Sequence, residues 1–268
     1  MNSIPIFDSL THPMPNGNWL TPDYNGRNSI QDLLSEMDVN NIQWALAVGM
    51  GSKIGGYQEE NYAAFIRGHS TNLLPVAFLD FDVLTSGISV AVYLRRLKSL
   101  GYVGIKIHPR LSSVDLLTPL MVELIKEANQ LELAVLLCTY FWSKDRKTCS
   151  NTPEKLLALL CEVPDEKLIL LHGGAVRLLE IAEMARHFQN ILVDLSFTMC
   201  KYEGSSIDLD IRYLFEKFDR RVCIGSDSPE FGVSKLRERF EFLTEGLDNT
   251  KKKNIGYQNL KNHIGAGL

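Results

Sequence analysis

Eight short apolar segments recur along this chain, and longer segments with helical spacing of apolar residues separate them. The segments are Ile4–Phe7, Trp44–Val48, Leu74–Leu79, Val103–Ile107, Ala134–Cys138, Leu168–His172, Ile191–Leu195 and Val222–Gly225. They are continuous apolar runs, a pattern typical of parallel strands that are covered on both faces. Eight such strands with helices between them predict an α/β fold, a single (β/α)8 barrel over residues 1–268. The alternative is an open doubly wound sheet, but the Gly-x-Gly-x-x-Gly turn usual after its first strand is absent.

Composition narrows the class of protein further. The chain has 268 residues, of which 45% are hydrophobic and 22% charged, as in ordinary soluble globular proteins. Its net charge is -4 and its basic residues are scattered, so we expect no nucleic-acid partner. The five cysteines are odd in number and form no CxxC pair, which indicates a reduced, cytoplasmic protein. No segment approaches the roughly 20 apolar residues of a membrane-spanning helix, and no signal peptide is visible, so we expect no membrane partner.

Polar residues gather where the predicted strands end. They are Asp8, His12, Lys106, His108, Arg110, Cys138, Tyr140, His172, Asp194, Ser196 and Asp227. In a barrel of this kind these strand ends meet around one mouth, where the active site lies. Lys106 and His108 point to the same face of their strand, and buried charge is costly unless it is paired or used. A functional site at the mouth is therefore predicted, although each residue also has a structural interpretation, such as helix capping by Asp227.

Five motifs carry a resemblance to a known family. They are residues 8–13 (DSLTHP), 104–109 (GIKIHP), 171–174 (LHGG), 193–196 (VDLS) and 225–229 (GSDSP). In order and spacing they resemble the strand-end motifs of the amidohydrolase superfamily. The most similar branch is the amidohydrolase-related group, which includes 2-pyrone-4,6-dicarboxylate lactonase and aminocarboxymuconate-semialdehyde decarboxylase. The resemblance extends over nearly the whole chain, to Asn259, and implies the same barrel and a small-molecule substrate.

The resemblance leaves two alternatives for a metal. Metal-binding members of the family take a His-x-His pair from strand one, histidines from strands five and six, and an aspartate from strand eight. Here Leu10 and Cys138 stand at two of these positions. The residues left for one divalent metal such as zinc are His12, His172 and Asp227, or Cys138 in place of His172. The other alternative is an enzyme without a metal, as in the lactonase branch.

The resemblance implies a hydrolase that acts on a small carboxylated lactone, ester or amide. In this interpretation Asp227 takes a proton from the attacking water, His172 polarises the carbonyl, and Lys106 supplies positive charge. Two alternatives stay open: a metal-dependent decarboxylase of the same family, and a barrel that binds a small molecule without catalysis. Enzymes of this size often form dimers, so a homodimer is a further expectation.

The remaining residues at the mouth are expected to bind the substrate. His108 and Arg110 would hold its carboxylate, and Tyr140 and Trp142 would form part of the pocket wall. Cys138 has two interpretations. A cysteine after four apolar strand residues is most often a small buried hydrophobe. A Cys–His pair with His172 on the adjacent strand is the alternative.

Overall fold

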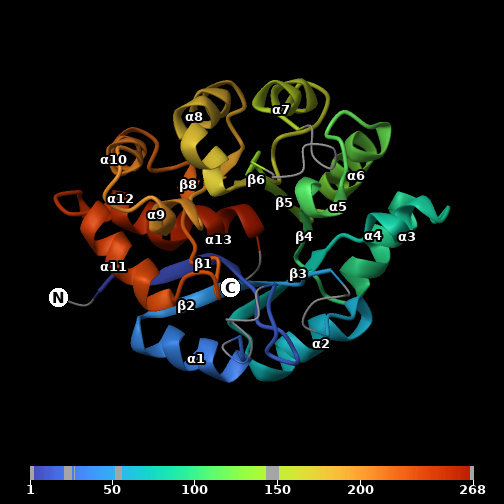
Figure 1. Ribbon diagram of the computed structural model, residues 1–268, viewed down its shortest axis with the longest axis horizontal. Coiled ribbons are helices and arrows are strands. Elements are labelled where there is room, and N and C mark those ends of the chain that lie inside the picture. The colour runs from blue at the N-terminus through green and yellow to red at the C-terminus, as the bar shows by residue number, and fades with distance from the viewer. Residues whose placement is uncertain (1–2, 21–25, 27, 52–55, 143–150, 266–268) are drawn as a thin grey trace.

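A computed structural model describes residues 3–20, 26, 28–51, 56–142 and 151–265, and they form a ring of eight strands surrounded by helices (Figure 1). The strands pair in chain order, and every neighbouring pair is parallel. They are β1 (Ile6–Thr11), β2 (Ile42–Val48), β3 (Leu73–Phe78), β4 (Gly104–Ile107), β5 (Ala134–Cys138), β6 (Leu168–Leu171), β7 (Leu192–Asp194) and β8 (Val222–Cys223). The predicted (β/α)8 barrel is confirmed.

Hydrogen bonds between β1 and the segment that follows β8 close the ring. The Ser9 amide donates to the Ile224 carbonyl at 3.0 Å, and the Asp227 amide donates to the Leu10 carbonyl at 2.9 Å. The His12 amide donates to the Ser228 carbonyl at 2.9 Å and so continues this pairing. The carboxyl ends of the first and last strands therefore lie side by side, and this places His12 next to Asp227.

Helices cover the outside of the ring and one of its ends. They are α1 (Ile30–Val39), α2 (Glu59–His69), α3 (Phe81–Thr85), α4 (Val90–Ser99), α5 (Pro109–Ser112), α6 (Pro119–Gln130), α7 (Pro153–Leu160), α8 (Leu178–His187), α9 (Thr198–Lys201), α10 (Ile207–Lys217), α11 (Val233–Leu243), α12 (Asn249–Lys253) and α13 (Asn259–Ile264), with a 3-10 segment η2 (His172–Arg177) and a π-helical segment η3 (Asn254–Gln258). Capping side chains define where some of these helices begin. Ser29 and Thr118 accept hydrogen bonds from backbone amides in the first turns of α1 and α6. None of the described helices combines the length and the apolarity needed to cross a membrane.

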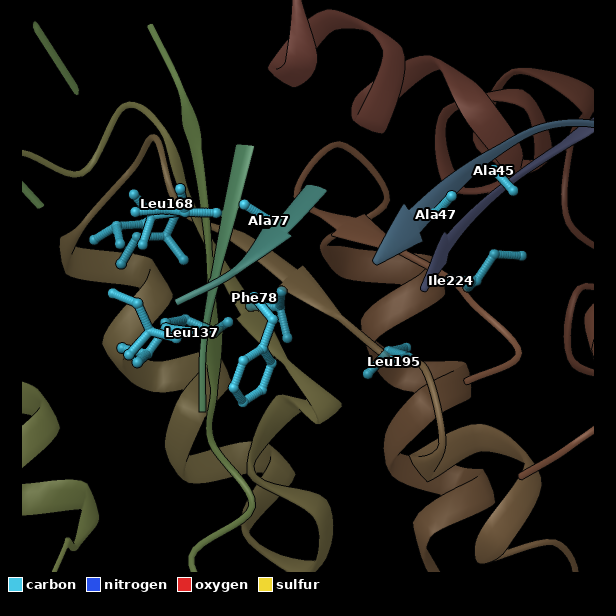
Figure 2. Packing of buried hydrophobic residues seen from close by; sticks show 14 of the residues in the cluster. Ala45, Ala47, Ala77, Phe78, Leu137, Leu168, Leu195 and Ile224 are labelled. Carbon is cyan, nitrogen blue, oxygen red and sulfur yellow. The ribbon is translucent and has the colours of Figure 1, made fainter. Parts of the chain in front are cut away.

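Two apolar clusters make up the core. The larger one fills the layer between the strands and the outer helices, and Figure 2 shows Ala45, Ala47 and Ala77 there beside larger side chains such as Leu137. The smaller cluster lies inside the barrel toward the amino-terminal ends of the strands, and it includes Leu260 and Ile264 of α13. The side chain of Asn259 donates to the carbonyl of Val222, at the start of β8, so α13 closes the amino-terminal end. The opposite end of the barrel, at the carboxyl ends of the strands, stays open for a site.

The ends of several elements differ from the sequence predictions. β1 extends to Thr11 rather than ending at Phe7, because the Asp8 carboxylate is satisfied inside the barrel by the Leu10 and Ser226 amides, at 3.1 and 2.9 Å. The short helices α3, α5 and α9 were not expected. At the end of the described chain, α12, η3 and α13 follow one another without a break.

Candidate active site

A cavity of about 290 Å³ opens at the carboxyl ends of the strands. The described residues that line it are His12, Trp19, Leu20, Met50, Lys106, His108, Arg110, Tyr140, His172, Phe197, Asp227 and Glu230. The structure thus brings together residues that we identified on strands one, four, five, six and eight. Trp142, which we expected in the pocket wall, is 48% exposed and is not among the described lining residues. The aromatic wall at this side is formed by Tyr140 and Phe197 instead, with ring centroids 5.7 Å apart.

His12, Lys106 and Asp227 form what we call the lysine cluster. His12 Nδ1 lies 2.9 Å from the Val48 carbonyl, which can only accept, so Nδ1 carries the proton of the neutral ring. His12 Nε2 then accepts from Lys106 Nζ at 3.1 Å. The same nitrogen lies 3.5 Å from Asp227 Oδ1. His12 Nε2 is therefore the atom that contacts both the Lys106 side chain and the Asp227 carboxylate.

Burial and mutual charge set the ionisation of the lysine cluster. Burial, followed by the charge of Lys106, lowers the pKa of His12 to about 4, although Asp227 opposes the shift. Burial also lowers the pKa of Lys106, and the charges of Asp227 and Cys138 act against this. Burial alone would raise the pKa of Asp227, but the neighbouring His12, His172 and Lys106 side chains outweigh burial and lower the pKa. Asp227 is therefore ionised and His12 neutral near pH 7.

His108, Cys138 and His172 form a second group, the cysteine cluster. Lys106 pairs with Leu136 across β4 and β5, so His108 lies level with Cys138 two residues further on. Cys138 pairs with Leu171 of β6, directly before His172. Cys138 itself is not among the described residues that line the cavity, and both imidazoles act on the pKa of its thiol.

Backbone contacts assign the ring nitrogens of the cysteine cluster. His108 Nδ1 accepts from the Leu111 amide at 3.2 Å, so Nε2 carries the proton of the neutral ring. His172 Nδ1 lies 3.1 Å from the Ser196 carbonyl and therefore carries a proton. For both histidines, Nε2 is the ring nitrogen left to meet Cys138.

The cysteine cluster favours an ion pair. Burial raises the pKa of the Cys138 thiol, but the charges and hydrogen bonds of His108 and His172 outweigh it and hold the pKa well below its usual range. Burial alone would lower the pKa of His172, whereas Cys138, Asp227 and Asp194 together raise it to about 9. Burial lowers the pKa of His108. Near pH 7 His172 is therefore protonated, and its neighbours shift Cys138 toward the thiolate form.

A buried polar layer lies directly below the pocket. Asp194 Oδ1 accepts from the His172 amide at 3.2 Å and from the Ser196 hydroxyl, and Asp194 Oδ2 accepts from the Ser9 hydroxyl. Asp8 is likewise enclosed, and burial raises the pKa of its carboxyl to about 7. These groups do not line the pocket. Asp194 holds the backbone amide of His172, and the Ser196 carbonyl holds its ring.

Two residues of the site have left-handed backbone conformations. His172 has φ 65° and directly follows β6, and Asp227 has φ 58° and lies four residues beyond the end of β8. Such conformations are uncommon for residues other than glycine and persist where the surrounding structure enforces them. Here the neighbouring hydrogen bonds turn both side chains into the same cavity.

Arg110 adds a second cation at the rim. Its guanidinium lies over the Tyr140 ring, 5.0 Å from the centroid. Its buried Nε has no hydrogen-bond partner within the described part of the chain. A donor of this kind suits an anionic group on a ligand, because a buried unsatisfied donor is costly.

Sequence reasoning missed several lining residues. Trp19 stacks on His12 at 4.9 Å between ring centroids, and its Nε1 donates to Glu230 Oε1 at 2.7 Å. Both come from loops that have no periodic signal, and they are distant in sequence. Phe197 contacts the His172 ring at 5.7 Å. It directly follows Ser196 at a strand end, and this position was a signal that could have identified it.

The predicted metal ligands do not form a metal site. Across residues 3–20, 26, 28–51, 56–142 and 151–265, no group of three or more His, Cys, Asp or Glu side chains is arranged to hold a metal ion. His12 Nε2, the nitrogen that would face a metal, lies 3.1 Å from the ammonium of Lys106. The donor set therefore does not fit zinc, because a cationic side chain lies against the nitrogen that would bind it.

Comparison with known protein families establishes which family this chain belongs to. The model of the amidohydrolase family matches residues 60–258 of this chain. The chain belongs to the amidohydrolase family. The resemblance seen in its strand-end motifs is thereby confirmed. A search of curated proteins found no match.

Several solved structures share the whole barrel. An uncharacterized TIM-barrel protein from Bordetella bronchiseptica is 17% identical with a TM-score of 0.80, over 98% of this chain and 100% of that one. A putative 2-pyrone-4,6-dicarboxylic acid hydrolase from Pseudomonas putida is 15% identical with a TM-score of 0.72, over 100% of both chains. The 5-carboxyvanillate decarboxylase of Sphingomonas paucimobilis is 13% identical with a TM-score of 0.67, over 98% and 99%. At these identities the likeness shows the fold.

Proposed function

We propose that this protein is a hydrolase that cleaves a small carboxylated lactone, ester or amide, with water activated by Asp227 and no metal required. The observation that carries this proposal is the lysine cluster, in which Lys106 Nζ lies 3.1 Å from His12 Nε2 and His12 Nε2 lies 3.5 Å from Asp227 Oδ1. A fixed ammonium beside an ionised carboxylate supplies the two functions that hydrolysis needs, an electrophile and a base. The likeness to a putative dicarboxylic acid hydrolase supports the same class of substrate.

In this mechanism the scissile carbonyl oxygen turns toward Lys106. The ammonium stabilises the negative charge that develops on that oxygen as the tetrahedral intermediate forms. Asp227 is held ionised by its neighbours, so it accepts a proton from the attacking water. His12 stays neutral, with its pKa lowered to about 4, and orients the ammonium without competing for its charge.

The other side of the pocket serves the leaving group and the substrate carboxylate. His172 is protonated near pH 7, because its pKa is raised to about 9, and it donates its proton to the departing oxygen or nitrogen. Arg110 presents its unsatisfied Nε to the carboxylate of the substrate. His108, which also lines the pocket, faces the same end.

Substitution of Asp227 tests the proposal. The variant Asp227→Asn keeps the shape of the side chain but removes the base, so we expect turnover of carboxylated lactones or esters to fall by on the order of 10³-fold. Asp38→Asn, at an exposed position on α1, is the matched control and should leave turnover unchanged. Near wild-type turnover of the Asp227 variant, with an unchanged melting temperature, would refute the role of this residue.

Metal analysis tests the second part of the proposal. Protein purified without chelators is expected to contain no stoichiometric divalent metal and to keep its turnover after dialysis against a chelator. Stoichiometric zinc, lost together with activity on chelation, would contradict metal-free hydrolysis. Release of carbon dioxide from aromatic or diene carboxylates by the metal-loaded protein would then support the decarboxylase alternative.

A further inference from the structure

The pocket has a carboxylate on the wall opposite to its arginine. Arg110 follows β4 and Glu230 follows β8, and both residues line the cavity. In a closed ring of eight strands that pair in chain order, the fourth strand and the eighth lie across from each other. The two residues therefore belong to opposite walls. The proposed hydrolysis uses Arg110 for the substrate carboxylate and leaves Glu230 without a role.

Two contacts hold Glu230 on its wall, and both involve other residues of the pocket. The Glu230 amide donates to the Asp227 carbonyl at 2.9 Å. Its Oε1 accepts from Trp19 Nε1 at 2.7 Å, and the Trp19 ring lies against the His12 ring with 4.9 Å between centroids. Oε2 has no hydrogen-bond partner among the residues that the structure describes. The carboxylate is thus fixed in position and keeps one oxygen to accept from a ligand.

Arg110 is fixed in a comparable way on the other wall. It lies in the first turn of α5, and its guanidinium is over the ring of Tyr140, which follows β5, at 5.0 Å from the centroid. Its buried Nε has no partner in the described ranges of the chain. The pocket therefore presents a charged donor from one wall and a charged acceptor from the opposite wall.

The size of the cavity lets one ligand meet both walls. Its volume of about 290 Å³ is at the lower end of the roughly 300–1,000 Å³ of small-molecule pockets, so it suits a compact ligand, such as one with a single ring. A carboxylate that approached Glu230 would meet a like charge, whereas the same group is attracted to Arg110. The two walls thereby fix the direction in which a carboxylated ligand enters.

We propose that the substrate carries a hydrogen-bond donor, a hydroxyl or an ammonium, at the end opposite to its carboxylate, and that Glu230 binds this donor. The inference rests on the proposed function and narrows its class of substrate. The carboxylate binds Arg110, the donor binds Glu230 Oε2, and the scissile carbonyl lies between them at Lys106. A hydrogen bond to a charged group adds both affinity and specificity, because a substrate without the donor leaves the carboxylate unpaired.

Three ligands of equal shape test the inference. They are 4-ethylbenzoate, 4-(hydroxymethyl)benzoate and 4-(aminomethyl)benzoate, which share one carboxylate and end in a methyl, a hydroxyl or an ammonium group. Isothermal titration calorimetry of the full chain at pH 7 measures their affinities. We expect the hydroxyl or the ammonium ligand, or both, to bind roughly 10- to 100-fold more tightly than 4-ethylbenzoate. A preference for one of these two ligands identifies which donor the substrate carries.

Substitution of Glu230 assigns the preference to this residue. Glu230→Gln keeps the shape of the side chain and an acceptor for Trp19 but removes the charge. The advantage of the ammonium ligand over 4-ethylbenzoate should fall at least tenfold, while the affinity for 4-ethylbenzoate and the melting temperature stay unchanged. Glu123→Gln, at an exposed position on α6, is the matched control and should alter none of the affinities.

Two further variants separate the roles of the walls. Arg110→Met should weaken all three ligands by a similar factor, because they share the carboxylate. Trp19→Phe keeps a ring against His12 but removes the donor that holds Glu230, so it should reduce only the preference for a donor, by about threefold to tenfold. This selective loss is the signature of a positioning residue, and an equal loss for all three ligands would contradict it.

The outcomes distinguish this inference from the proposed function, because none of the three ligands contains a bond to hydrolyse. Equal affinities for the three, no binding of any of them, or a preference for the ammonium ligand that persists in Glu230→Gln would overturn the inference. Turnover of carboxylated esters together with any of these results would leave the proposed hydrolysis in place. A preference that depends on Glu230, in a protein that hydrolyses no ester, would support the polarity of the pocket and refute the hydrolase.

Discussion

The lysine cluster and the cysteine cluster each contribute a histidine to the same cavity, yet these two histidines differ in charge. His12 is neutral near pH 7, with its pKa lowered to about 4, and His172 is protonated, with its pKa raised to about 9. Both rings are buried and both bond a backbone carbonyl through Nδ1. The difference comes from the remaining neighbours. His12 Nε2 contacts the Lys106 side chain, whose charge lowers the pKa of His12 although Asp227 opposes it, whereas Cys138 and two carboxylates raise the pKa of His172.

The comparison shows how one residue type can be given two tasks. A neutral imidazole that accepts from lysine orients a cation, whereas a protonated imidazole donates to a leaving group. Pairs of groups whose surroundings push their pKa values apart indicate where the acid and the base of a reaction are located. In this pocket the acid is assigned to the cysteine cluster, at His172, and the base to the lysine cluster, at Asp227.

Among the variants that test the difference between the two histidines, Lys106→Met is expected to have the largest effect. It removes the charge but keeps most of the side-chain volume. Turnover should fall by about 10²- to 10³-fold through loss of oxyanion stabilisation. The pKa of His12 should rise from about 4 toward its ordinary value near 6.5, because the charge of Lys106 is one cause of the lowering. Nuclear magnetic resonance titration of the His12 ring measures this shift.

Lys253→Met, at an exposed position in α12, is the control for this variant and should change neither quantity. An unchanged pKa of His12 in Lys106→Met would show that the charge of Lys106 is not what keeps His12 neutral.

Arg110→Met is expected to have the next largest effect, and on binding rather than on chemistry. A hydrogen bond between charged groups contributes about 1.5–3 kcal/mol, so KM for a carboxylated substrate should rise by roughly 10- to 100-fold while kcat changes little. The matched control is the uncharged methyl ester of the same substrate, which should show no difference between the wild type and the variant. A fall in kcat with KM unchanged would place Arg110 in the chemical step instead.

The pH dependence of kcat/KM distinguishes the two histidines in the unmodified protein. His172 acts as an acid and must keep its proton, so the rate should stay constant as pH rises through 7 and fall above pH 9, tenfold per pH unit. His12 acts while neutral and loses its function only when it gains a proton, below about pH 4. A rate that instead rises through pH 9 would show that His172 acts without its proton.

The smallest effect is expected from Ser196→Ala. The Ser196 hydroxyl donates to Asp194 and lies 3.3 Å from His172 Nδ1, but the Ser196 carbonyl, at 3.1 Å from the same nitrogen, is retained in the variant. A threefold to tenfold loss of turnover is expected, on the order of one neutral hydrogen bond. Steady-state kinetics measures it, and Ser205→Ala, at an exposed position, is the control. A loss as large as that of Lys106→Met would show that the hydroxyl, and not the carbonyl, fixes His172.

The sequence by itself determined the barrel and the identity of most polar residues at its mouth. Continuous apolar runs at regular intervals are local features, and strand ends in a parallel barrel must meet at one face. For this reason Lys106, His172 and Asp227 could be placed at the site without coordinates. The strand-end motifs likewise contained the family relationship, which the match over residues 60–258 confirmed.

Only the tertiary structure decided how these residues are charged and which of them touch. The pKa of a buried group depends on neighbours that come from other strands, as when His12 meets Lys106 across 94 positions of the chain. The contact between Trp19 and Glu230 likewise joins residues that are 211 positions apart, and the histidines that act on Cys138 come from two other strands. The sequence places side chains at a strand end, but the closure of the ring determines their distances, and distances in a medium of low polarity determine their chemistry.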